Sequence, residues 1–114
     1  MTKINAAAVQ KRFPSPITFM NSSILRNDQY CVGGAFCLFV NNLEGKEVMP
    51  IQFLTALTFP AHQFLAAYLS HVNPNLKEGE ALVFATAITL SNDYTNFDDA
   101  WAHLDEALNF GEVT

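Results

Sequence analysis

The sequence has few charged residues and no long apolar run. Only 15% of its 114 residues are charged, and half are hydrophobic. Disordered chains lack the apolar area that offsets the entropy of ordering, so this composition excludes disorder and predicts one domain spanning residues 1–114. No apolar run reaches the roughly 18 residues needed to cross a bilayer, and the N-terminus lacks a basic-then-apolar secretory pattern. We therefore expect a cytoplasmic protein with no membrane partner.

Cysteine is also scarce. The chain has two cysteines, Cys31 and Cys37, which cannot form a disulfide framework. In a helix, residues six positions apart lie about 120° apart around the axis and about 9 Å apart along it. That separation exceeds the reach of a disulfide, so we expect both thiols to be reduced.

Basic residues are absent from the C-terminal third. Residues 78–114 contain eight acidic residues and no Lys or Arg, whereas residues 1–77 contain six basic and three acidic residues. Because nucleic-acid affinity comes from Lys and Arg that neutralise phosphates, we expect no nucleic-acid partner. The acidic third is either a solvated helix surface or a recognition surface for a basic partner, including the basic half of a second copy.

Apolar residues recur at helical spacing in the second half of the chain. Pro60 suits the first turn of a helix, and Leu65, Tyr68 and Leu69 then fall on one helical face. A last helix capped by Thr95 or Asn96 carries an apolar stripe of Trp101, Leu104 and Leu108. Residues 76–90, after a capping-box spacing at Asn75, are apolar on almost every side. Such a helix must be surrounded, so we expect it at the centre of the fold.

The first half gives a less regular picture. Residues 1–26 predict a short helix that ends before Pro14, followed by an irregular or short extended connection. Asn27 or Asp28 is a suitable N-cap for a helix that runs to about Asn41. Gly33 and Gly34 weaken that helix by about 1 kcal/mol each and indicate close approach of a neighbouring backbone. An alternative interpretation is a β-hairpin at about 36–53.

Together these patterns predict an all-α domain of four to five helices around a central buried helix. The alternative fold class, which stays open on the sequence, is α+β with the hairpin at about 36–53. No repeat, low-complexity tract or linker interrupts the chain.

Cys31 is the one candidate nucleophile. In the first turn of a helix its thiolate would be stabilised, and His62, at the edge of an apolar helix face, is the candidate base. A buried packing cysteine explains the same residue without chemistry. The sequence therefore favours a non-enzymatic protein with no assigned catalytic residue, and the cysteine-dependent hydrolase or transferase stays as the alternative.

The candidate binding residues lie in two polar or glycine-containing segments. They are Tyr30, Cys31, Gly33, Gly34, Asn92, Asp93 and Tyr94. We expect the turn at 92–96 to form a recognition loop beside the Cys31 segment, or to satisfy its own backbone. Neither segment has the spacing of a metal site, a calcium loop or a phosphate loop, so we expect no metal and no cofactor.

Several short motifs resemble an uncharacterised family of small helical bacterial and phage proteins, over roughly residues 27–110. The motifs are Tyr30-Cys31-Val32-Gly33-Gly34-Ala35, Phe59-Pro60, Asn92-Asp93-Tyr94-Thr95-Asn96-Phe97, Asp99-Ala100-Trp101 and Leu104. The resemblance implies a small helical fold and no particular activity. We expect a protein-interaction or regulatory module that binds a protein partner or associates with itself as a homodimer.

Overall fold

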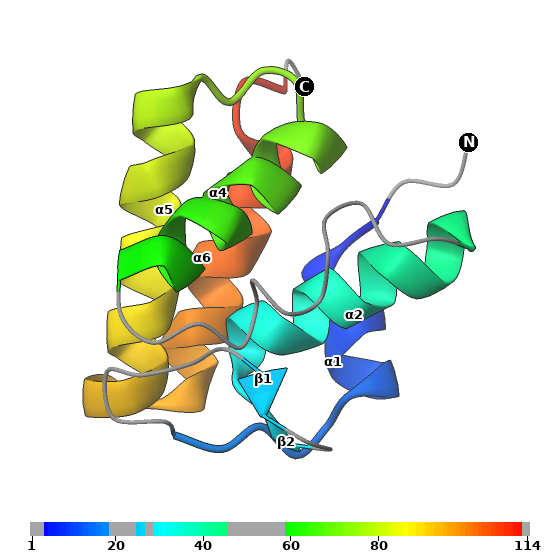
Figure 1. Ribbon diagram of the computed structural model, residues 1–114, viewed down its shortest axis with the longest axis vertical. Coiled ribbons are helices and arrows are strands. Elements are labelled where there is room, and N and C mark those ends of the chain that lie inside the picture. The colour runs from blue at the N-terminus through cyan, green and yellow to red at the C-terminus, as the bar shows by residue number, and fades with distance from the viewer. Residues whose placement is uncertain (1–3, 19–24, 27–28, 46–58, 113–114) are drawn as a thin grey trace.

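A computed structural model describes residues 4–18, 25–26, 29–45 and 59–112. Across these residues the chain forms five α-helices, a π-helical turn and one two-residue antiparallel ladder (Figure 1). The elements are α1 (Ala6–Arg12), β1 (Leu25–Arg26), β2 (Gln29–Tyr30), α2 (Val32–Glu44), α4 (Phe59–Val72), α5 (Glu78–Leu90), η1 (Ser91–Thr95) and α6 (Phe97–Asn109). The predicted all-α single domain is confirmed.

The alternative hairpin is wrong where it can be followed. Residues 36–44 belong to α2, which ends at Gly45 in the left-handed conformation (φ 71°). Residues 46–53, the rest of the proposed hairpin, lie outside the described residues. The continuous apolar run of α2 suits a helix buried on several sides better than a strand with alternating faces.

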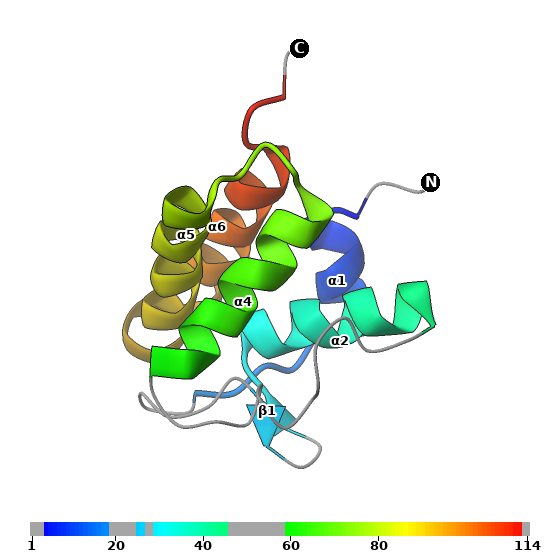
Figure 2. The same ribbon diagram turned by 45° about the horizontal axis from the view of Figure 1, so that its top comes forward.

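The central helix is α2, so the prediction that residues 76–90 form the centre is wrong. α2 contacts α1, α4, α5 and α6, and in both ribbon views it runs from the middle of the molecule past α1 toward the edge (Figure 1, Figure 2). Seven of its 13 residues are buried, against four of 13 in α5. A small residue permits the crossing, because a Cβ atom on Gly33 would lie 2.7 Å from Leu65 Cδ2. The close neighbour is thus a side chain of α4 rather than a backbone.

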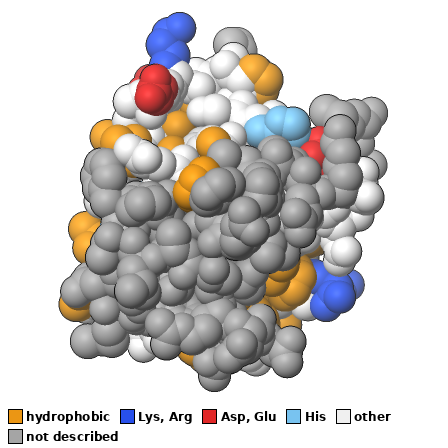
Figure 3. All heavy atoms as spheres, viewed as in Figure 1, with side chains coloured by type: hydrophobic (Ala, Val, Ile, Leu, Met, Phe, Trp, Pro, Cys, Tyr) orange, Lys and Arg blue, Asp and Glu red, His pale blue; other side chains and the backbone are white. Residues whose placement is uncertain are grey.

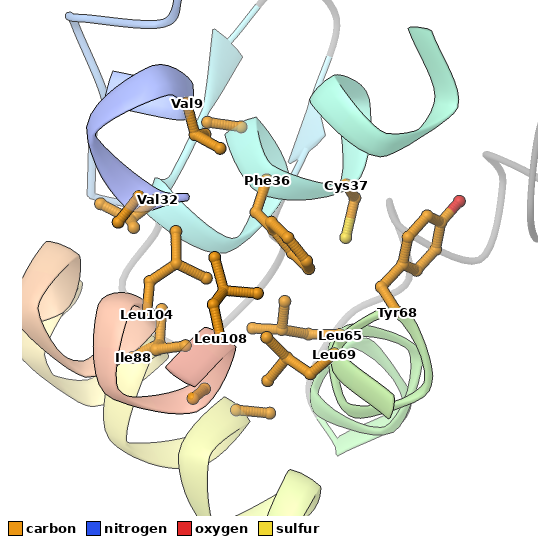
Figure 4. Close-up of a cluster of buried hydrophobic side chains, with 14 of the residues drawn as sticks. Val9, Val32, Phe36, Cys37, Leu65, Tyr68, Leu69, Ile88, Leu104 and Leu108 are labelled. Atoms are coloured by element: carbon orange, nitrogen blue, oxygen red, sulfur yellow. The ribbon is translucent and has the colours of Figure 1, made fainter. Parts of the chain in front are cut away.

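Side chains from every α-helix meet in one core (Figure 4). Phe36 of α2 and Leu65 of α4 are fully buried, as are Ile88 of α5 and Leu104 of α6. Val9 adds α1 to the same cluster. The predicted apolar faces of the helices at 59–72 and 97–109 are therefore confirmed.

The observed starts of α2 and α5 differ from the predicted ones, whereas that of α6 agrees. Asn5 caps α1 by accepting from Ala8 N at 2.8 Å, and α2 begins after Cys31 rather than after Asn27 or Asp28. α5 begins after Lys77, whose N–H donates to Glu80 Oε1 at 3.1 Å, so the expected box at Asn75 is displaced by two residues. Asn96 caps α6 as predicted.

A buried asparagine joins α4 to the far end of α6. Asn73 Nδ2 donates to the carbonyls of Ala107 and Phe110, each at 2.9 Å, and its Oδ1 accepts from Asn75 N at 3.1 Å. The last carbonyls of α6 have no partner within their own helix. Asn73 therefore closes α6 and fixes where α5 starts.

Within the described part of the chain, no helix has both the length and the apolar character required to traverse a membrane.

Candidate functional site

Cys31 is the N-cap of α2 rather than a residue of its first turn. Its backbone is extended (φ −92°, ψ −178°), and its Sγ accepts a hydrogen bond from Gly34 N at 3.4 Å. The side chain is 1% exposed. Burial raises the pKa of the Cys31 thiol to about 12, although hydrogen bonds from the Gly34 and Gly33 backbones oppose the rise. The thiol is neutral at pH 7, which suits a cap and opposes nucleophilic attack.

Asn92 completes this cap from a distant part of the sequence. Its Oδ1 accepts from Val32 N at 3.0 Å, and its Nδ2 donates to Ile17 O at 3.0 Å and to Asp93 Oδ1 at 2.9 Å. The side chain is 2% exposed. The N-terminus of α2 is thus closed by two side chains, and its first N–H groups have protein partners.

Tyr30 also has a structural role in the observed contacts. Its backbone oxygen accepts from Ile17 N at 2.9 Å, and its hydroxyl accepts from Ser15 N at 3.3 Å. The Tyr30 ring packs edge-on against Phe13, with ring centroids 5.2 Å apart. The segment at 13–17 is therefore held against β2 and the start of α2.

The two candidate segments lie side by side, as one of the two sequence alternatives had it. Tyr30, Cys31, Gly34, Asn92 and Asp93 meet around the start of α2. The expected polar turn is instead the π-helical turn η1, which continues α5 directly because Leu90 and Ser91 keep helical backbone angles. Tyr94 points outward and is 53% exposed, so it does not share the buried cluster.

His62 lies near this cluster without completing a reaction centre. Burial lowers the pKa of the half-buried His62, and the negative charge of Asp93 opposes that effect. The same Asp93 charge contributes to the raised pKa of Cys31. The Cys31 sulfur nevertheless binds Gly34 N, so the proposed thiol–imidazole pair has no observed hydrogen bond among the described residues. In the same residues, no group of three or more His, Cys, Asp and Glu side chains is suitably placed for a metal ion.

A second candidate surface lies on the outer face of α5. We define the α5 stripe as Val83, Ala87, Leu90 and Tyr94. Val83 is 69% exposed and Leu90 is 46% exposed. At about 100° per residue, positions 83, 87 and 90 fall within about 60° of each other, and Tyr94 follows in η1. Hydrophobic side chains also reach the surface along the edge of the molecule where Figure 1 places α5 (Figure 3).

A groove lies between α4 and α5, on the side of α5 that carries Leu82, about 100° around the helix from Val83. Its volume is about 580 Å³. Small side chains (Ala66, Ala67 and Ala81) form much of its wall, and Leu82 lies on the side of α5. We call it the α4–α5 groove. Sequence analysis missed both surfaces because it assigned every apolar residue of α5 to the core.

The chain matches no family model, and no curated protein or solved structure was found to be similar to it. The resemblance carried by the Tyr30–Ala35 and Asn92–Phe97 motifs therefore stays a prediction. The contacts above give those motifs a shared physical role, because each supplies one half of the α2 cap.

Proposed function

We propose that this protein is a non-enzymatic protein-interaction or regulatory module whose C-terminal third recognises a basic partner. The observation that carries the proposal is the combination, on α5, η1 and α6, of an exposed apolar stripe with one sign of charge. Val83, Leu90 and Tyr94 are exposed, and residues 78–114 contain eight acidic residues and no Lys or Arg. Exposed apolar surface in a charged surround is typical of interaction sites.

The acidic residues of α6 support this proposal by their position. Asp98, Asp105 and Glu106 are all exposed, whereas Leu104 and Leu108 of the same helix are buried. The acids thus lie on the solvent side of α6, which packs directly against α5. A surface of one sign attracts oppositely charged partners and raises their rate of association.

The alternative, a cysteine-dependent hydrolase or transferase, has weaker support. Cys31 is buried, and the pKa of its thiol is raised to about 12. An active cysteine needs a thiol that is both accessible and ionised. The Cys31 thiol is neither. A cytoplasmic location belongs to the proposal as well, since Cys31 and Cys37 are both free and buried and free thiols persist in reducing compartments.

The test is capture of partners from the native host with an immobilised full-length chain. The charge-neutralised variant Asp98→Asn/Asp105→Asn/Glu106→Gln changes exposed residues only. At low salt, charges are little screened, so the wild-type chain should retain its basic partners. We expect the charge-neutralised variant to lose them. The matched control is Lys11→Gln/Arg12→Gln on the exposed end of α1. An identical partner set for all three proteins would overturn the proposal.

A further inference from the structure

The outer face of α5 is an apolar surface that the other described residues leave uncovered. Three large apolar side chains of the α5 stripe (Val83, Leu90 and Tyr94) are between 46% and 69% exposed. The opposite side of the helix, with Ala81, Ala85 and Ile88, already fills the core. Scattered exposed apolar residues need no explanation, but a row at helical spacing does.

Gly79 extends the same face toward the start of α5. A Cβ atom at this position would have no neighbour within 4 Å, so nothing in the chain requires glycine there. Glycine weakens a helix by roughly 0.5–1 kcal/mol relative to alanine. A missing side chain does, however, let the backbone of another helix approach closely.

The α4–α5 groove opens on the flank of α5 that carries Leu82 and can receive larger side chains. Its wall of Ala66, Ala67 and Ala81 leaves about 580 Å³ open between the two helices. Partner helices commonly lay one apolar face along such a groove and insert anchors three and four residues apart. The stripe supplies the flat part of that surface, and the groove supplies the pocket.

The charges near the stripe indicate which kind of partner can bind there. Glu78 and Glu80 flank the start of the stripe, and Asp98 and Asp99 begin the helix that follows Tyr94. Lys77, the N-cap of α5, is exposed beside Glu78, so the start of the face carries two acids and one base, and its end carries two acids. In a symmetric pair of α5 helices, acid would face acid in either orientation, which disfavours a second copy as the occupant. A helix with Lys or Arg at both ends is complementary to this face.

We propose that the α5 stripe and the α4–α5 groove together dock a basic amphipathic helix of a partner protein. This inference rests on the proposed function and adds the site and the chemistry of the partner. Leucine-like anchors of the partner helix pack on Val83 and Leu90, and its terminal basic residues face the acidic ends of the surface.

The test uses a fluorescently labelled 18-residue peptide of Leu and Lys, with Leu at helical spacing and Lys at both ends. Its affinity for the full-length chain is measured by anisotropy. We expect Val83→Glu/Leu90→Glu to weaken binding by at least about tenfold, because it places charge in the apolar centre of the contact. Leu43→Glu/Ala102→Glu adds the same charge at exposed positions of α2 and α6, and we expect it to leave the affinity within about twofold.

Four results would overturn the inference. Equal affinity of the two double variants would show that the stripe is not the site. Equal binding of a scrambled peptide of identical composition would show that the contact is purely electrostatic. The acidic surface would then attract the peptide, but no helix would dock on the stripe. No binding of either peptide would remove the docking site, and partner capture with the charge variants would then judge the proposed function separately. Light scattering that shows a wild-type dimer abolished by Val83→Glu/Leu90→Glu would assign the face to a second copy.

Discussion

The start of α2 and the outer face of α5 use residues in opposite ways. The start of α2 contains Gly33 and Gly34, which are poor helix formers, and polar groups contributed by Cys31 and Asn92, yet all four residues are buried. α5 is apolar on nearly every side, yet Val83 is 69% exposed. The comparison shows that burial here follows shape and hydrogen bonding. Small residues whose polar groups are hydrogen-bonded can occupy the centre, and apolar residues can remain exposed.

The strongest test of this difference between the two regions is whether Cys31 of the folded chain reacts like a surface thiol. Burial raises the pKa of the Cys31 thiol to about 12, so the thiol stays protonated at neutral pH. We expect iodoacetamide, followed by mass spectrometry, to modify neither cysteine of the folded chain at pH 7 and both in denaturant. Stoichiometric alkylation of the folded protein would instead revive the cysteine enzyme.

The raised pKa also sets the direction of a pH effect on stability. Because the folded thiol titrates above the unfolded one, the stability it contributes is fully present below about pH 9 and is lost as the pH rises toward 12. Cys31→Ser replaces the capping sulfur with a hydroxyl oxygen, which does not titrate in this range, and should reduce this alkaline loss relative to the wild-type chain.

The second-largest effect is expected at Asn92. Asn92→Ala removes the acceptor for Val32 N and the donor to Ile17 O, and each unpaired buried group costs roughly 1–3 kcal/mol. We expect the free energy of unfolding to fall by about 3 kcal/mol in denaturant titrations. Tyr94→Ala is the control within the same π-turn, where an exposed side chain should cost less than about 0.5 kcal/mol.

A matched pair of valines separates the two regions directly. Val32 of α2 is fully buried, whereas Val83 of α5 is 69% exposed. Val32→Ala should lower the free energy of unfolding by about 2 kcal/mol through lost burial and a residual cavity. Val83→Ala should change it by less than about 0.5 kcal/mol. Equal losses in urea unfolding would mean that α5 has no free outer face.

The smallest effect tests the two helical glycines. Gly79→Ala adds a methyl group to open space, so we expect a gain of roughly 0.5–1 kcal/mol from helix propensity. Gly33→Ala places its Cβ 2.7 Å from Leu65 Cδ2, and the required shift of a fully buried side chain should cancel that gain. Thermal unfolding of both variants should therefore give a higher Tm only for Gly79→Ala.

The helices themselves could be predicted because their local signals agree. Asn96, Leu104 and Gly111 mark the start, face and end of α6, and Gly111 has the positive φ (78°) that favours glycine. The face of α4 could be predicted for the same reason, since Leu65, Tyr68 and Leu69 follow the helical period and are fully buried.

The caps and the centre could not be predicted because they depend on contacts between distant residues. Nothing local indicates that Asn92 will close a helix that starts 60 residues earlier, or that Cys31 will displace Asp28 as the N-cap. A helix that is apolar on every side can be surrounded by its own chain or can keep one face exposed, and hydrophobicity alone does not distinguish the two cases. The sequence favoured a buried, non-catalytic Cys31, and the residue is buried. Its role as the α2 cap and the exposure of Val83 were not predicted.

The π-helical turn has a consequence for which changes the chain can accept. Between Leu90 and Asn96 it turns Asn92 toward Val32 while Tyr94 remains outside. Inserting or deleting one residue there would rotate everything downstream by about 100° and separate the inward amide from its target. The outward tyrosine can be exchanged without disturbing this contact, but the number of residues in the turn is fixed.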